Sequence, residues 1–399
     1  MRKILLGIAI TSVLFTSCSN DDDINLNPQV EAPLTYKFMR DGKSTVDFNG
    51  QTTRIKMAME FRSALKNTTK SASDLYGMFA HVEGGNDFSE ADLNASGKNI
   101  RSKVAASKEY FSANTTVSNQ IKSLMDSWIE QQATTVFENW ENIATAGTAG
   151  QLQQAGGGSV RYVNGKGLEL DQAIAKTLIG GLMTDQMLNH YLSTSVLDEA
   201  SNIQNNDNSV LEEGKPYTTM EHKWDEAYGY LYGNEDDPSA PALNADSFLN
   251  TYLKQVDSDP DFAGTASAVY DALKLGRAAI VAKNYEVRDA QVAIIRENIS
   301  KVPAVRAVHY LQVGKEKLAT GDMASAFHAL SEAYGFINSL QFTRQPNAST
   351  PYFTHEEVTG FMDTLMEGNG FWEVTDETLD DMSQTIAAKF GFTVAAATN

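Results

Sequence analysis

The sequence predicts an all-α protein of two helical bundles with a minor β-hairpin near its N-terminus. Apolar residues recur three and four positions apart over most of the chain, which is the period of an amphipathic helix. Strand-like alternation occurs once, at residues 44–48 ahead of Asn49-Gly50, a pair typical of hairpin turns. With 399 residues, 42% of them hydrophobic, the chain is long enough for two domains and a large core.

The predicted helices follow the periodic segments in chain order. They cover residues 54–66, 98–113, 117–146, 169–193, 218–232, 245–256, 265–283, 288–319, 323–340, 355–366 and 376–390. Pro303 predicts a kink or a break in its helix, because proline lacks the N–H and its ring clashes with the preceding turn. Segments 147–165, 203–217 and 234–244 are rich in glycine or polar residues and are expected to be loops. We place the two bundles at residues 34–215 and 216–399.

The N-terminus has the pattern of a lipoprotein signal. Arg2 and Lys3 precede an apolar stretch at residues 4–15, which is typical of a secretory signal and too short for a membrane-spanning helix. Cys18, the only cysteine, follows at the position where a lipobox carries the acylated thiol. We therefore interpret residues 1–17 as a signal peptide and the polar, proline-containing residues 18–33 as a flexible tether. An ordinary signal with a chance cysteine is the alternative.

The expected location is the outer membrane, with lipid on Cys18 as the anchor. The acidic residues 21–23 resemble the surface-export signal of Bacteroidetes lipoproteins, so we expect the cell surface, with the periplasmic face as the alternative.

Charge and motif content narrow the classes of function. The chain has 32 Lys and Arg against 51 Asp and Glu, a formal net charge of −19. This balance argues against nucleic acid as a partner and favours cations as small ligands. One cysteine excludes an internal disulfide framework and Cys-based zinc sites. The sequence contains no H-E-x-x-H and no G-x-S-x-G, so a binding protein is favoured over an enzyme.

The densest group of reactive side chains lies at residues 221–229. His222, Asp225 and Glu226 are three and four positions apart on a predicted helix, so they could share a face and bind one cation. The opposite face carries Met220 and Trp224. A plain solvent-exposed face is the alternative interpretation.

Three further metal-ligand candidates lie on other segments. Glu169 opens a predicted helix, where the helix dipole alone also favours a carboxylate. Asp185 lies deep in an apolar helix, where a buried carboxylate needs a partner. His309 falls on an apolar stripe, which also suits a packed core histidine. His328 and Glu332, four positions apart, form a possible additional pair.

The same segments resemble a known family. Residues 36–38, 42–48, 50–54, 93–98, 165–169, 185–186 and 221–230 follow its order. The family is the Bacteroidetes lipoprotein family registered as domain of unknown function number 4856, which is imelysin-like, and the resemblance runs from about residue 34 to the C-terminus. It implies two helical bundles with a polar cleft between them. Imelysin-like proteins carry a G-x-H-x-x-E pattern that has been connected with peptidase activity and with iron uptake. His222 and either Asp225 or Glu226 would take the places of its His and Glu, while Met220 stands where the pattern has Gly.

The sequence therefore predicts a surface lipoprotein that binds iron, another metal or haem and passes it to an outer-membrane transporter. One alternative is a zinc peptidase that uses His222 and Glu226 with His309 or His328. Another is capture of a glycan or a peptide, since residues 309–340 resemble a single paired-helix repeat of the kind used for protein contacts.

Overall fold

The computed structural model describes residues 30–398, and within them it confirms the all-α prediction. The signal peptide, Cys18 and most of the tether lie outside the described residues. The α-helices are α1 (Asn49–Ala64), α2 (Ala72–Phe79), α3 (Ala91–Asn94), α4 (Lys108–Phe111), α5 (Thr115–Gln131), α6 (Leu170–Leu178), α7 (Thr194–Leu197), α8 (Asn202–Asp207), α9 (Thr219–Tyr232), α10 (Leu249–Ser258), α11 (Thr265–Val281), α12 (Tyr285–Ala319), α13 (Met323–Ser339), α14 (His355–Leu365) and α15 (Asp376–Phe390). Segments of π-helix continue α5 over Gln132–Val136 and follow α6 over Ile179–Thr184 and Met187–Tyr191.

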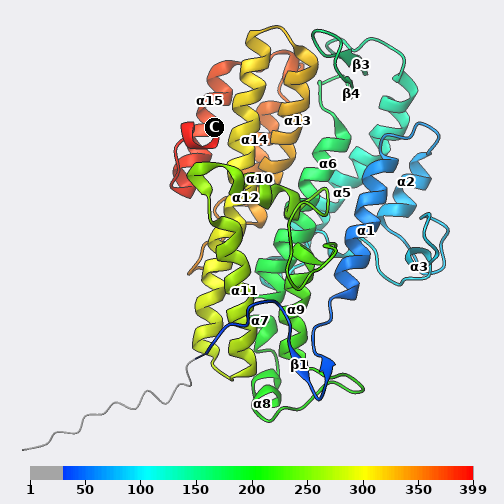
Figure 1. Cartoon of the computed structure of the whole chain (residues 1–399). Coiled ribbons are helices and arrows are strands. Elements are labelled where there is room, and N and C mark those ends of the chain that lie inside the picture. The colour runs from blue at the N-terminus through cyan, green and yellow to red at the C-terminus, as the bar shows by residue number, and fades with distance from the viewer. Residues whose placement is uncertain (1–29, 399) are drawn as a thin grey trace, which may run out of the picture.

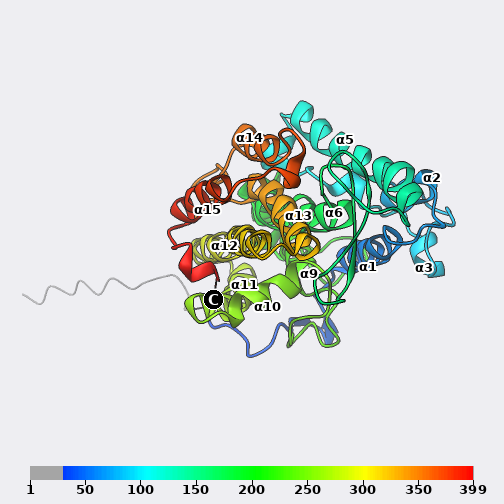
Figure 2. The ribbon, with the colours of Figure 1, turned by 90° about the horizontal axis from the view of Figure 1, so that it is seen from above.

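The long helix α12 organises the molecule. It runs along the length of the body, with α11 and α13 packed beside it (Figure 1). Seen from above, α6 and α13 lie near the middle, with α14 and α15 on one side and α1, α2, α3 and α5 on the other (Figure 2). Buried apolar residues form one cluster that extends from Tyr36 to Ala397. The division at residue 215 remains a prediction.

Pro303 does not break α12. The helix is continuous from Tyr285 to Ala319, and Pro303 is buried within it. Because α12 packs against α10, α11, α13 and α15, burial of its apolar residues offsets the hydrogen bond that proline removes.

The predicted helix at 98–113 is wrong. Only a 3-10 turn, Arg101–Lys103, and the short helix α4 form there. Between them Ala105 has a φ of +45°, and its N–H donates to the Gly181 carbonyl. The N–H groups of Ala106 and Ser107 both donate to Asp185. Tertiary hydrogen bonds thus hold this backbone in a non-helical path, which helical periodicity cannot reveal.

The predicted N-terminal hairpin is confirmed, although its turn lies elsewhere and a second hairpin was not predicted. The N-terminal hairpin pairs β1 (Met39–Arg40) with β2 (Lys43–Ser44) through Asp41-Gly42, while Asn49 begins α1 instead of forming a turn. A second hairpin pairs β3 (Gly150–Gln153) with β4 (Val160–Val163) inside the predicted glycine-rich loop. In the described part of the chain, no helix is both long and apolar enough to cross a membrane.

Candidate functional site

Helix α9, which carries the predicted His and carboxylates, is enclosed on nearly all sides. Thr218 begins it with a capping box: its hydroxyl oxygen accepts the Glu221 N–H, and the Glu221 carboxylate accepts the Thr218 N–H at 2.7 Å. Met220 and Trp224 are buried, as their apolar face predicted. The supposedly polar side is covered as well, because α1 packs against it.

A glycine allows α9 and α11 to approach closely. A Cβ placed on Gly276 would lie 2.2 Å from Cζ2 of Trp224, so only glycine leaves room for the indole there. The Trp224 Nε1–H donates to the Leu273 carbonyl at 2.9 Å and fixes the ring against α11. This contact brings the next α11 residue, Arg277, alongside Asp225.

Arg277 is the centre of a buried ionic network, defined here as Arg40, Glu221, Asp225 and Arg277. Its Nε donates to Asp225 Oδ1 at 3.0 Å and its Nη1 to Glu221 Oε1 at 3.1 Å. Arg40 donates to both oxygens of Glu221 at 2.9 Å. Two guanidinium groups therefore balance two carboxylates. Burial raises the pKa of Asp225 to about 6, although the charge of Arg277 and a hydrogen bond from Tyr36 act in the opposite direction.

The network fastens the N-terminal hairpin to the helices. The Tyr36 hydroxyl donates to Asp225 Oδ1 at 2.7 Å, and its ring stacks on Tyr228 with centroids 3.6 Å apart. Arg277 Nη2 donates to the Thr45 hydroxyl, and its guanidinium lies 4.8 Å from the centre of the Phe38 ring. The charged residues of α9 and α11 thus determine where the hairpin lies.

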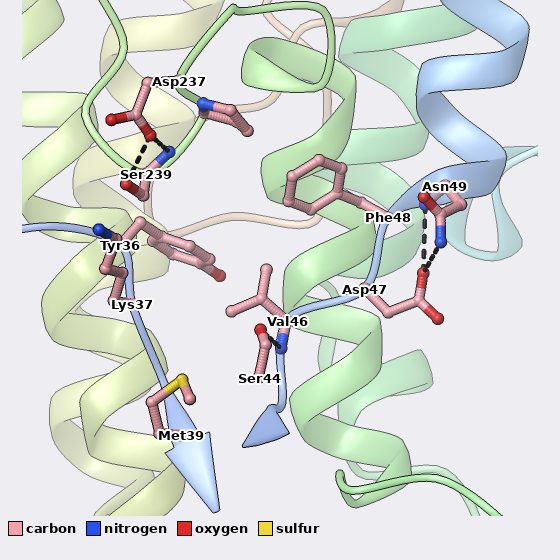
Figure 3. Close-up of a pocket in the computed structure, with 11 residues that line it drawn as sticks. Tyr36, Lys37, Met39, Ser44, Val46, Asp47, Phe48, Asn49, Asp237 and Ser239 are labelled. Carbon is pink, nitrogen blue, oxygen red and sulfur yellow. Dashed lines mark hydrogen bonds between the residues drawn. The ribbon is translucent and has the colours of Figure 1, made fainter. Parts of the chain in front are cut away.

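An open groove lies between the arms of this hairpin and the loop at residues 237–239 (Figure 3). We call it the hairpin groove; its volume is about 380 Å³. Its lining combines apolar side chains with carboxylate, amide, hydroxyl and ammonium groups. The lining residues are Tyr36, Lys37, Met39, Ser44, Val46, Asp47, Phe48, Asn49, Asp237, Pro238 and Ser239.

His222 and Glu226 face a different set of partners. The nearest approach of His222 Nε2 to Glu226 Oε2 is 4.0 Å, and the imidazole stacks on the Tyr217 ring. Glu226 accepts hydrogen bonds from Lys223 at 2.7 Å and from Gln51 at 3.1 Å. Burial alone would raise the pKa of Glu226, but the ammonium of Lys223 holds it below its usual value.

The other predicted ligands are each engaged elsewhere. Glu169 is buried and accepts a hydrogen bond from His328 Nδ1 at 2.7 Å, and burial raises its pKa. Asp185 is fully buried and accepts from Asn189 as well as from backbone N–H groups of residues 106 and 107; burial raises its pKa to about 6. His309 Nδ1 lies 3.1 Å from the Ala397 carbonyl oxygen.

The structure therefore separates the predicted ligands rather than gathering them. Asp225 pairs with Arg277, whereas Glu226 pairs with Lys223. Within residues 30–398, no group of three or more His, Asp and Glu side chains is arranged to hold a metal ion. Metal binding by His222, Asp225 and Glu226 stays a prediction.

Sequence reasoning missed Tyr36, Arg40 and Arg277. A lone arginine in the apolar pattern of α11 is the one signal that could have identified Arg277, since a buried guanidinium requires carboxylate partners. Tyr36 and Arg40 lie 189 and 181 positions from their α9 partners, and no local pattern marks such distant pairing.

The fold and the site define an all-α protein whose N-terminal hairpin forms a ligand-sized groove over a buried ionic network. The chain belongs to the family described as Domain of unknown function (DUF4856), whose model matches residues 33–393. Neither the curated proteins nor the solved structures include a match to this sequence.

Proposed function

We propose that the mature chain is a lipid-anchored, non-enzymatic binding protein of the outer-membrane surface that captures a sugar unit of a neutral glycan in the hairpin groove. The observation that carries this proposal is the mixed lining of the groove. A sugar ring presents apolar C–H faces together with hydroxyl groups that both donate and accept hydrogen bonds. Val46, Phe48 and Met39 can contact the C–H faces, while Asp237 can accept from a hydroxyl through Oδ2, since Ser239 donates to its Oδ1.

The architecture of the groove supports binding without a large rearrangement. The Tyr36 ring is held between Tyr228 and Asp225, and Asp237 holds its loop by accepting from the N–H and hydroxyl of Ser239 at 3.0 and 2.6 Å. Side chains that are already fixed lose little conformational entropy when a ligand binds. The charged residues of α9 thus act on the groove indirectly, by positioning the hairpin.

Metal or haem cargo, the function predicted from sequence, has less geometric support. Two pairs of candidate ligands lie close together, each with only two members: Glu169 with His328 at 2.7 Å, and His222 with Glu226 at 4.0 Å. Glu226 already neutralises the Lys223 ammonium. A divalent cation would have to displace that ammonium and recruit further ligands.

Calorimetric titration of the unlipidated mature chain, residues 19–399, tests the proposal. The probes are neutral chito-, manno- and xylo-oligosaccharides. Ser44→Trp fills the groove and is expected to abolish binding. Asp237→Ala is expected to weaken it by about tenfold, corresponding to one lost hydrogen bond to a charged group. Asp236→Ala, an equally exposed neighbour outside the lining, is the matched control.

Two outcomes would contradict the proposal: that none of these oligosaccharides binds to the protein, or that Ser44→Trp binds them as tightly as wild type does. Ferrous iron, a ferric chelate, zinc and haem are titrated in parallel. Tight binding of one of them that the His222→Ala, Glu226→Ala double variant loses would favour metal or haem cargo.

A further inference from the structure

A cluster of cations lies on the side of α9 that faces α1. We call it the Tyr191 cluster and define it as Arg54, Lys98, Lys103, Lys223 and the Tyr191 ring. The ammonium groups of Lys103 and Lys223 each lie 5.6 Å from the centre of that ring. The four cations come from α1, the 3-10 turn Arg101–Lys103 with the segment before it, and α9, so they converge from three separate parts of the chain.

The cations of the cluster outnumber the carboxylates. Within residues 30–398, no carboxylate forms an ion pair with Arg54, Lys98 or Lys103. Arg54 is 7% exposed and donates to two backbone carbonyls, those of Asn99 at 3.1 Å and Gly50 at 3.2 Å. Glu226, which pairs with Lys223, also acts on the charge of Lys103, and Glu199, which pairs with Lys108, acts on Lys223. In a protein of net charge −19, such a local excess of positive charge is an exception.

Two of these cations lie beside Gly50. A Cβ at this position would lie 3.4 Å from Cε of Lys98 and 3.6 Å from Nη1 of Arg54. Gly50 is also in the first turn of α1, where the helix dipole adds positive potential. Close packing therefore brings like charges together at a site that already favours an anion.

The protonation of a neighbouring histidine agrees with this positive field. The backbone N–H of Lys108 donates to His190 Nδ1 at 3.1 Å, so this nitrogen carries a lone pair and the ring is neutral. Burial, followed by the charges of Lys103 and Lys223, lowers the pKa of His190 to about 4.

We propose that the Tyr191 cluster binds an oxyanion: the carboxylate, sulfate or phosphate group of a small ligand, held between Lys98, Lys103 and Lys223. An oxyanion there would supply the negative charge that the folded chain lacks and would accept hydrogen bonds from several ammonium groups. The site is separate from the hairpin groove, although Asn49 lines the groove and the next residue, Gly50, lies against the cluster. The proposal does not depend on capture of a neutral sugar.

Binding should decrease as Lys103 loses its proton. Burial, and then Arg54, lowers its pKa to about 8; Lys223 and Lys98 add to this effect, while Glu226 opposes it. An oxyanion favours the charged ammonium, so anion affinity should fall between about pH 7 and pH 9.5.

Titration of the unlipidated mature chain with sodium phosphate, sodium sulfate and glucuronate, at constant ionic strength in chloride, tests this site. We expect saturable binding of at least one probe. Lys103→Met, which keeps the length of the side chain without its charge, should weaken it by about tenfold or more, and Lys103→Arg should retain it. Lys254→Met, which removes an exposed lysine from α10, is the matched control and should leave affinity unchanged.

The arms of this experiment distinguish the sources of the anion. Binding of glucuronate alone indicates a carboxylate, as in an acidic sugar, whereas binding of phosphate or sulfate indicates a tetrahedral oxyanion. No saturable binding of any probe, or equal affinity in wild type and Lys103→Met, would overturn the proposal. Ser44→Trp should not alter anion binding, so failure of the groove and failure of this site are distinguishable.

Discussion

Replacing Gly276 with alanine tests whether the close contact of α9 with α11 builds the site. The new methyl group would lie 2.2 Å from Trp224 Cζ2, whereas carbon atoms in contact are normally about 3.5 Å apart or more. The indole would have to move by more than about 1 Å. Because Trp224 is fully buried and donates to Leu273, that movement disturbs both its packing and its hydrogen bond.

The magnitude follows from two opposing effects. Alanine is favoured over glycine in a helix interior by about 1 kcal/mol, while forced overpacking of a tight core costs about 1–3 kcal/mol or more, and the lost indole hydrogen bond about 1 kcal/mol. We expect Gly276→Ala to lower the free energy of unfolding by about 2 kcal/mol. Gly360→Ala is the matched control: it lies inside α14 with no atom within 4 Å of the added Cβ, so it should stabilise by about 0.5–1 kcal/mol.

The assay is urea unfolding followed by tryptophan fluorescence, with near-ultraviolet circular dichroism to report the Trp224 environment. If Gly276→Ala were as stable as wild type, or stabilised as much as Gly360→Ala, the proposed contact between the helices would be refuted. A loss of stability together with weakened ligand binding in the hairpin groove would connect the contact to the position of Arg277.

Three further changes give separate tests. Arg277→Met leaves Arg40 as the one guanidinium for two buried carboxylates and should lower the free energy of unfolding by about 3–5 kcal/mol, measured by urea unfolding. The matched control is Lys274→Met: this lysine lies one turn away and pairs with an exposed carboxylate, so its loss should change stability by less than about 1 kcal/mol. The pKa of Glu332 is about 2, because the ammonium of Lys176 lowers it by more than burial raises it. The stability that this carboxylate contributes, about 3 kcal/mol in all, is therefore fully present above about pH 4.3 and is lost as the pH falls through about 2. Glu332→Gln should abolish that part of the acid dependence of unfolding. Lys103 has a pKa of about 8 in the folded chain and about 10.4 in the unfolded chain, so the unfolded chain binds more protons and stability rises with pH between these two values. Lys103→Met should therefore be more stable than wild type at pH 7, by about 3 kcal/mol at most, and this difference should shrink toward pH 10. A difference that does not change with pH would contradict this account.

The helices that were predicted well are those whose own apolar stripe meets a neighbour. The predicted ranges for α9, α11, α13 and α15 agree with the structure to within about two residues, because periodicity and burial coincide in them. Residues 98–113 fail because Asp185, about eighty positions away, accepts the N–H groups that a helix would need. The hairpin of β3 and β4 was missed because β3 contains glycine and two glutamines, and because β4, although its residues favour strands, is only four residues long.

The sequence directed attention to α9, but it identified neither the partners of α9 nor the groove, whose lining contains none of the predicted ligands. The density of charged residues at 221–226 pointed to α9, and the structure shows that this segment organises the hairpin and its groove. Arg277 and Arg40 lie 52 and 181 positions from their α9 partners, and only the fold brings them there. The lining of the groove comes from two stretches that are far apart in the sequence, residues 36–49 and 237–239, and neither stretch alone has a recognisable signature.

Helical geometry explains why Asp225 and Glu226, two of the predicted ligands, have different partners. Adjacent residues on a helix are rotated by about 100°, so Asp225 and Glu226 point in clearly different directions even though each is close in angle to His222. For an exposed helix that difference would matter little, since both side chains could bend toward one ion in solvent. Because α9 is covered on both sides, the difference in direction decides which partner each carboxylate meets. Asp225 faces α11 and pairs with Arg277, whereas Glu226 faces α1 and pairs with Lys223. Each carboxylate then has its own cation, so an added metal ion would have to compete with an ammonium or a guanidinium. On the α1 side the cations exceed the carboxylates, and the charge that this part of the fold lacks is negative.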